Sequence, residues 1–288
     1  MSTAVVSQHF SGSEGLSLAA DVGGDPSHSP IVLLHGGGQT RHAWRSTMSQ
    51  LISRDYHVIS YDARGHGDSE WAADGNYSLG KLTADLRCLA RHLSSPPILI
   101  GASMGGITSL HLSADLQKTG VAALVLVDVV PKADPRGLEK IKGFMSANPY
   151  GFESVEDAAR AVAEYNPQRR YQRDPSGLMK NLRYRADGRL RWHWDPRFLE
   201  YQIKTPLTAE LIVDPKQTID VPTLLVYGSN SDIVSPAGID DLRKSIPKLE
   251  VREVGNAGHM VVGDNNETFV EGMASFLKGL PMKEPRLT

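Results

Sequence analysis

The chain has 288 residues, of which 40% are hydrophobic and 22% charged, so it can bury the core of one large domain or of two small ones. Its formal net charge of −2 gives no overall field that would favour nucleic acid or an anionic membrane surface as a partner. A single cysteine excludes an internal disulfide and a cysteine-rich metal site. Met1–Phe10 lacks the pattern of a signal peptide, and no apolar run reaches the roughly 18 residues of a membrane span, so we expect a soluble, cytoplasmic protein.

The first half of the chain predicts a hairpin and then alternating strands and helices. Val5–Phe10 and Leu16–Val22 alternate in polarity and are separated by a glycine-containing turn, which indicates an antiparallel pair. Short apolar runs separated by helical patterns follow, as expected for a parallel sheet covered on both faces. The predicted strands are Ile31–Leu34, His57–Tyr61, Pro97–Ile100 and Val121–Val127, and the predicted helices are His42–Ile52, Leu79–Leu93 and Gly106–Leu116.

The pattern changes after Pro131. From 132 to 216 the chain is highly charged, its periodicity is helical (Val155–Tyr165, Pro175–Tyr184), and no strand alternation is clear. Alternation then resumes. The predicted elements there are Thr223–Tyr227, Ile239–Ser245, Glu250–Val254 and Phe269–Leu277. We therefore predict an α/β fold in which 1–131 and 217–288 form one core domain, interrupted by a helical insert at 132–216.

A basic cluster lies within this insert, interleaved with Asp174 and Asp187. A solvated helical face is the favoured interpretation, and a site for an anionic tail of a substrate is the alternative. The cluster consists of Arg169, Arg170, Arg173, Lys180, Arg183, Arg185, Arg189 and Arg191.

The segment Gly101–Gly105 places Ser103 between small residues, directly after a predicted strand and before a predicted helix. A sharp strand-to-helix turn of this G-x-S-x-G type exposes a serine hydroxyl as a nucleophile. The flanking glycines keep side chains away from the neighbouring strand and helix. The pattern alone is weak, but its context predicts a catalytic serine.

A serine hydroxyl needs a base to take its proton and an acid to orient that base. We predict His259 as the base because it lies in a glycine-flanked loop after the last predicted strand. For the acid we favour Asp232, which follows the strand Thr223–Tyr227 and gives the chain order Ser, Asp, His. Asp128 also ends a strand and is the competing candidate.

Two backbone amides are the predicted donors to an oxyanion, those of Met104 and Gly37. Gly37 belongs to the run His35-Gly36-Gly37-Gly38 after the first parallel strand, and Gly38 is the second choice for this donor. The spacing of this run disfavours a phosphate cradle, because Arg41 stands where the dinucleotide-binding pattern requires a glycine.

The chain carries the motifs His35–Gly38, Tyr61–Ser69, Gly101–Gly105, Asp232 and Gly258-His259. As a set, they resemble those of the α/β-hydrolase fold superfamily, and in particular those of the compact microbial serine esterases and the cofactor-free haloperoxidases or perhydrolases. The resemblance implies a structural role for Tyr61–Ser69 and a helical cap between the sixth and seventh core strands that roofs the pocket. It also implies no metal and no organic cofactor. Gly38 and Trp44 are expected to contact the substrate. Aromatic residues of the cap could line the pocket or pack within the cap itself, namely Phe144, Tyr150, Phe152, Trp192 and Trp194.

These residues predict a serine hydrolase that cleaves a carboxylic ester or a similar acyl compound of a small molecule. Perhydrolase, lactonase, C–C bond hydrolase and acyltransferase activities would use the same three side chains. Epoxide hydrolysis and dehalogenation need a carboxylate where Ser103 stands and are disfavoured. A small-molecule receptor on a hydrolase fold is a further alternative, and the oligomeric state is open.

Overall fold

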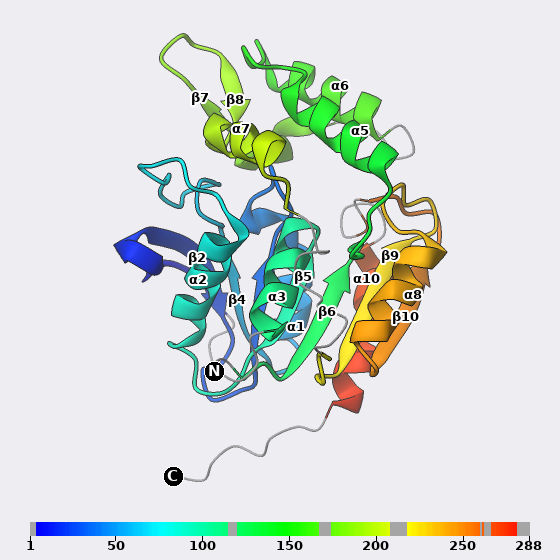
Figure 1. Ribbon diagram of the computed structural model, residues 1–288. Coiled ribbons are helices and arrows are strands. Elements are labelled where there is room, and N and C mark those ends of the chain that lie inside the picture. Colours follow the sequence, from blue (N-terminus) through cyan, green and yellow to red (C-terminus); the bar gives the residue numbers. More distant parts are fainter. Residues whose placement is uncertain are drawn as a thin grey trace.

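The computed structural model describes residues 4–114, 120–166, 174–207, 218–259, 261 and 266–280. Within them an eight-stranded sheet has the order β1-β2-β4-β3-β5-β6-β9-β10 (Figure 1). Its strands are β1 (Val6–Ser11), β2 (Ser17–Gly23), β3 (Pro30–Leu34), β4 (His57–Tyr61), β5 (Ile98–Ala102), β6 (Ala123–Val127), β9 (Thr223–Gly228) and β10 (Leu249–Val254). The β1–β2 hairpin and the β2–β4 pair are antiparallel, and all other pairs are parallel. The predicted fold class is confirmed.

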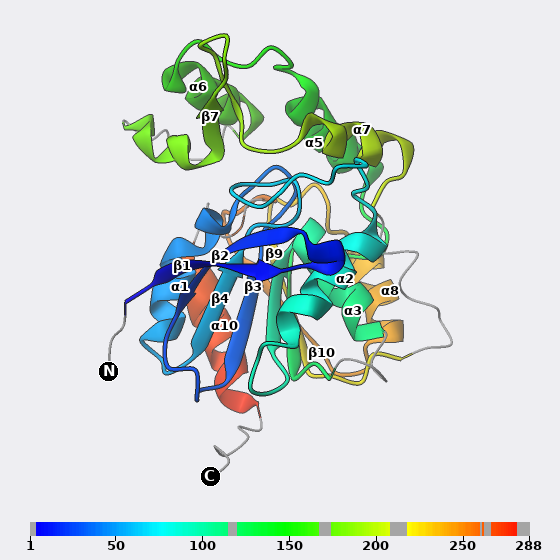
Figure 2. The ribbon, with the colours of Figure 1, turned by 90° about the vertical axis from the view of Figure 1, so that its left-hand side faces the viewer.

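Helices cover both faces of the sheet, as Figure 2 shows. Because successive side chains of a strand point to opposite faces, Val32 and Leu34 join one buried cluster while Ile31 and Leu33 join the other. The first cluster packs under α2 (Leu79–Ala90), α3 (Met104–Ala114) and α8 (Pro236–Ser245), and the second under α1 (Arg45–Ile52) and α10 (Asn266–Gly279). This double burial explains the nearly continuous apolar strands of the sequence. The predicted end of the third helix, at Leu116, and the tail after Leu280 lie outside the described residues.

Between β6 and β9 the chain forms a separate layer above the sheet (Figure 1), which we call the cap. Its elements are α5 (Pro135–Ser146), α6 (Val155–Tyr165), the 3-10 helix η3 (Pro175–Asn181), β7 (Leu182–Tyr184), β8 (Leu190–Trp192) and α7 (Pro196–Lys204). The end of the predicted insert, 208–216, falls outside the described residues. In the described chain, no helix is both long enough and apolar enough to cross a membrane.

One expectation for the cap is wrong. Pro175–Tyr184 was predicted to be helical, but only Pro175–Asn181 is, and the chain continues as β7, which pairs with β8 in an antiparallel hairpin. The turn between them contains Asp187 and Gly188, and Gly188 has φ of 77°. Asp-Gly is a strong hairpin signal, because glycine adopts a positive φ without steric cost. Strands of three residues are too short to show the alternation of polar and apolar residues that is typical of a strand.

Several helices start with the same local chemistry. Asp134, Asp195 and Ser235 each cap a helix by accepting a hydrogen bond from a backbone N–H, and each is followed by a proline in the first turn. The cap side chain satisfies an N–H that has no partner within the helix, and proline has none to satisfy. These caps fix where α5, α7 and α8 begin.

Candidate active site

Ser103 lies on the turn between β5 and α3 with φ of 47°, a left-handed conformation that costs energy for a residue other than glycine. Its N–H donates to the carbonyl of Val127 at 3.1 Å, which fixes the turn against β6. A Cβ on Gly101 would lie 2.4 Å from the carbonyl oxygen of Gly105, and one on Gly105 would lie 2.4 Å from that of Leu34. The turn therefore tolerates only glycine at these positions, as its sequence pattern indicates.

His259 is paired with Asp128 and not with Asp232. His259 Nδ1 lies 2.7 Å from Asp128 Oδ2, and the Asp128 side chain is 1% exposed. The carboxylate of Asp232 instead forms an ion pair with Lys140 of the cap, 2.8 Å away and open to solvent. The predicted pairing of Asp232 with His259 is thus wrong, and the competing candidate occupies the position.

The surroundings of Asp128 explain why a carboxylate can be buried there. It also accepts hydrogen bonds from the Ser231 hydroxyl at 2.7 Å and from the Gly228 N–H at 3.2 Å. These donors take the place of solvent around the carboxylate oxygens, so the buried group keeps its hydrogen bonds. Asp128 follows five buried apolar residues and precedes Val129 and Val130, which are also buried. An acidic residue inside such a run is the sequence signal that could have identified it.

The glycine loop after β3 faces Ser103, since a Cβ on Gly36 would lie 3.5 Å from Ser103 Cβ. The Gly36 N–H donates to Gln39 Oε1 at 3.0 Å, and the Gly38 N–H donates to His66 Nε2 at 3.1 Å. Within the described residues, the Gly37 N–H has no such acceptor. Met104 is the first residue of α3, so its N–H is one of those that a helix leaves without an internal partner. The contacts thus favour Gly37 over Gly38 as the oxyanion donor, which stays a prediction.

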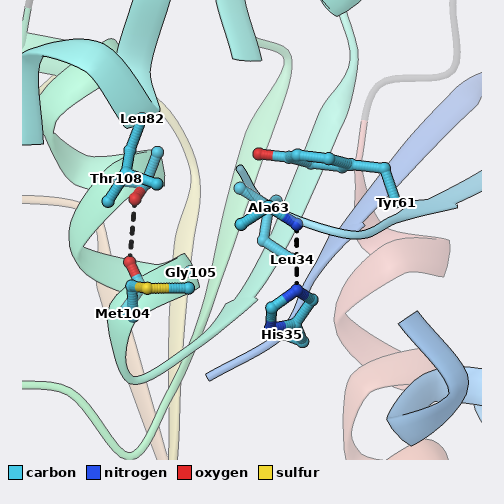
Figure 3. A pocket seen from close by; sticks show the side chains of 8 residues that line it. All are labelled: Leu34, His35, Tyr61, Ala63, Leu82, Met104, Gly105 and Thr108. Atoms are coloured by element: carbon cyan, nitrogen blue, oxygen red, sulfur yellow. Dashed lines mark hydrogen bonds between the residues drawn. The ribbon is translucent and has the colours of Figure 1, made fainter. Parts of the chain in front are cut away.

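Two buried histidines support this loop from behind. His66 Nδ1–H donates to the carbonyl of Arg64 at 3.1 Å, which leaves Nε2 to accept from Gly38. Burial, together with the neighbouring His35, lowers the pKa of His66 to about 3, so His66 is neutral and remains an acceptor at neutral pH. His35 Nε2 accepts the Ala63 N–H at 3.0 Å (Figure 3), and burial also lowers its pKa. A void of about 10 Å³, barely the size of one water, lies beside Met104, and Figure 3 shows the side chains that line it.

Replacing His66 by phenylalanine is expected to reduce kcat by about tenfold or more while changing KM little. Phenylalanine keeps the ring that packs edge-on against Phe198, but it offers the Gly38 N–H no acceptor. The Gly38 N–H is partly buried, so leaving it without an acceptor costs up to about 1–3 kcal/mol, and it frees the loop that carries the Gly37 amide. This prediction is tested by measuring the steady-state kinetics and the melting temperature of H66F and of the natural sequence. A lower melting temperature with unchanged kcat would show that His66 serves stability alone.

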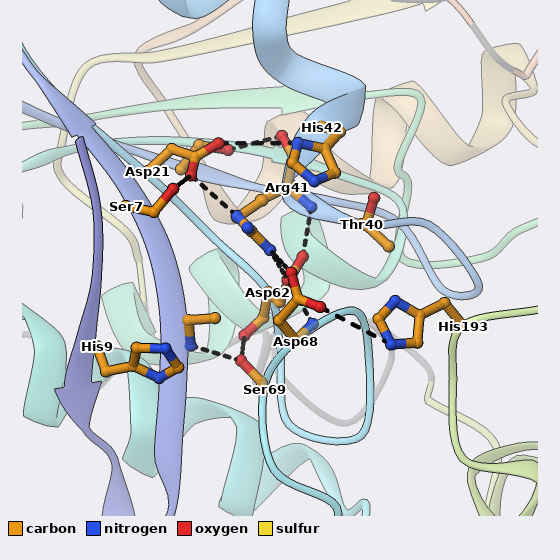
Figure 4. A network of polar contacts seen from close by, with 12 residues as sticks. Ser7, His9, Asp21, Thr40, Arg41, His42, Asp62, Asp68, Ser69 and His193 are labelled. Carbon is orange, nitrogen blue, oxygen red and sulfur yellow. Dashed lines mark hydrogen bonds and ion pairs between the residues drawn. The ribbon is translucent and has the colours of Figure 1, made fainter. Parts of the chain in front are cut away.

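The segment Tyr61–Ser69 has the structural contacts that its resemblance implied. The guanidinium of Arg64 is buried against Asp85, with Nε 2.6 Å from Oδ2. Figure 4 shows Arg41 between the carboxylates of Asp21, Asp62 and Asp68. Burial acts to raise the pKa of Asp68, but hydrogen bonds from Arg41 and from the cap residue Arg183 hold it below its ordinary value. Asp68 thus joins the core to the cap as an ionised group, 3.0 Å from Arg183.

The cavity above Ser103 has a volume of about 640 Å³ and is lined by core and cap residues together, including Ser103, Met104 and His259. Trp44 and Gly38 lie along it, as predicted, although their contact with substrate stays a prediction. Of the five cap aromatic residues named from the sequence, three line the cavity, namely Phe144, Trp192 and Trp194. Phe152 is buried within the cap and Tyr150 is exposed.

The described part of the basic cluster is not a helical face. Arg183 pairs with Asp68, Arg189 with Glu153 and Arg191 with Asp187, all on or around the β7–β8 hairpin. Lys180 is the member that lines the cavity. Arg169, Arg170 and Arg173 lie outside the described residues. Elsewhere in the described chain, no cluster of three histidine, cysteine or acidic residues is placed to hold a metal ion.

A mostly parallel sheet, a serine on a strained turn after a strand, and a histidine–carboxylate pair at the same cavity define the class of α/β hydrolases. The chain belongs to the alpha/beta hydrolase fold family, whose model matches residues 29–266.

Curated relatives of the chain include a lipase and an esterase. It is 29% identical to sn-1-specific diacylglycerol lipase ABHD11 of Mus musculus, over 88% of this chain and 82% of that protein. It is 27% identical to Esterase Rv0045c of Mycobacterium tuberculosis, over 84% of this chain and 80% of that protein. The crystal structure of E-2-(acetamidomethylene)succinate hydrolase has a TM-score of 0.82 at 21% identity, covering 96% of this chain and 100% of that one, which supports the fold alone.

Proposed function

We propose that the protein hydrolyses a carboxylic ester, or a similar acyl compound, of a small molecule through an acyl-enzyme on Ser103. The observation that carries this proposal is the 2.7 Å contact between His259 Nδ1 and buried Asp128, at a cavity that Ser103 also lines. Asp128 holds one imidazole nitrogen protonated, so the other is free to accept the proton of a serine hydroxyl. The lipase and the esterase among the relatives support the same reaction class.

The proposed reaction has two steps. Ser103 Oγ attacks the ester carbonyl while His259 takes its proton, and His259 then protonates the departing alcohol. The oxyanion that forms is held by the N–H groups of Gly37 and Met104, and losing one such donor costs about 3–4 kcal/mol in known cases. Water then attacks the acyl-enzyme with His259 as base, releasing the acid and restoring Ser103. Asp128 orients the imidazole and stabilises the imidazolium in both steps.

The nucleophile restricts the chemistry. A serine alkoxide forms a tetrahedral adduct at a carbonyl, whereas displacement at a saturated carbon through an enzyme ester requires a carboxylate at that position. The cavity is lined largely by apolar side chains of the cap, which suits an acyl chain or a hydrophobic alcohol.

A product assay with competing acceptors tests this function. We expect para-nitrophenyl butyrate to give a burst of nitrophenolate, followed by steady release of butyrate, with water as the main acceptor in the presence of dilute methanol or peroxide. Peracid as the main product would instead assign a perhydrolase. Tight ligand binding with no turnover of any ester would contradict the proposal and favour a receptor.

A further inference from the structure

The charges that line the active-site cavity have one sign. Among the described residues, the lining includes two lysines, Lys142 and Lys180, and no aspartate or glutamate. Asp128 is buried and contacts the imidazole of His259, and it does not itself line the cavity. A cavity with low-dielectric walls and charges of one sign concentrates ligands of the opposite sign.

The two lysines differ in their partners. Lys142 Nζ lies 3.2 Å from Glu139 on the same helix, so its charge is already paired. Lys180 is half-buried, and no carboxylate of the described chain lies within 4.0 Å of its ammonium group. A partly desolvated ammonium without a counter-ion gains from an anion more than a solvated one does.

The backbone at Lys180 is held in place by its neighbour. Lys180 is the last residue but one of η3, and the last residue, Asn181, accepts a hydrogen bond from the Thr40 hydroxyl at 2.8 Å through its side chain. The Asn181 carbonyl accepts the N–H of His193 at 2.8 Å. Thr40 lies two residues after Gly38, so these bonds hold Lys180 beside the loop that faces Ser103. The charge of Lys180 also contributes, after burial and Arg41, to the lowered pKa of His42 on the cavity wall.

We propose that Lys180 binds an anionic group of the substrate, so that the preferred substrate is an ester that carries a second, carboxylate-type group. This inference rests on the proposed ester hydrolysis at Ser103 and specifies its substrate class. The competing possibility is that only the aliphatic stem of Lys180 lines the wall while the ammonium group reaches solvent.

A matched pair of substrates tests the proposal. One is the mono-para-nitrophenyl ester of adipic acid, and the other is the isosteric neutral ester in which an isopropyl group replaces the terminal carboxylate. For the natural sequence, we expect kcat/KM to be roughly tenfold higher for the anionic ester, as one charge-assisted hydrogen bond provides. In K180M this ratio should fall about tenfold, mainly through KM, and K180R should retain most of it. Added salt should lower the ratio for the natural sequence and not for K180M.

The control is K140M, which removes the same charge from the cap outside the cavity, where Lys140 pairs with Asp232. This variant should keep the natural ratio. An unchanged ratio in K180M, or an equal drop in K140M, would overturn the assignment of Lys180. If neither ester is turned over faster than by S103A, the proposed hydrolysis fails. In that case, the binding of adipate measured by calorimetry tests the role of Lys180. K180M should abolish this binding, and equal binding of adipate by K180M would also overturn the assignment.

Discussion

S103A is expected to reduce the turnover of short para-nitrophenyl esters by about a million-fold, the size of effect seen when a catalytic serine is removed. Alanine leaves the acyl group no atom with which to form an ester, so the two-step route is lost. The fold should persist, because the turn is fixed by Gly101, Gly105 and the backbone bond to Val127, none of which the substitution touches. Initial rates and a thermal melt of both proteins make the measurement.

Ser113 provides a matched control for this prediction. It lies on the same helix, α3, and its hydroxyl donates to the carbonyl of Ser109 at 2.8 Å, so it satisfies only helix backbone. S113A should keep full turnover. Retained turnover in S103A would contradict the assigned nucleophile, and a loss of similar size in both variants would assign the effect to folding.

D128N is expected to reduce kcat by about ten-thousand-fold, whereas D232N should change kcat by less than threefold, roughly the effect of a surface ion pair. An asparagine at position 128 no longer selects the imidazole tautomer that accepts the serine proton, and it removes the charge that stabilises the imidazolium. Asp232 contacts only the exposed Lys140 ammonium group among the side chains described around it.

The comparison of the two variants is decisive because both substitutions are isosteric and both residues follow the carboxyl ends of neighbouring parallel strands, β6 and β9. The test measures saturation kinetics of both variants and verifies their folding by circular dichroism. A large loss in D232N with near-normal D128N would restore the pairing that chain order alone favours and would contradict the geometry around His259.

The sheet could be predicted because both of its faces are covered. Strands such as Ile31–Leu34 must then be apolar throughout, and that pattern is local in the sequence. The β7–β8 hairpin could not be predicted from alternation, because its three-residue strands are stabilised by contacts such as the bridge between Phe152 and Leu190. Tertiary packing, and not local periodicity, defines these strands.

The candidate active site could also be predicted only in part. Ser103 and its glycines could be identified from the chain because the turn itself imposes the residue types. The sequence could not decide between Asp128 and Asp232. Because β6 and β9 are neighbouring parallel strands, both aspartates follow carboxyl ends of strands that lie side by side. The support that His66 gives to Gly38 was also missed. It joins residues 28 positions apart and becomes visible only once the loops are folded together.

The proposed reaction depends on Ser103 as the nucleophile that becomes acylated. Incubation with a fluorophosphonate, followed by proteolysis and mass spectrometry, tests it most directly, because the reagent is attacked by an activated serine and the adduct is stable. We predict one phosphonylated site per chain, located on Ser103 and missing from S103A. A label on another residue of the natural sequence, or equal labelling of S103A, would rule out Ser103 as the nucleophile.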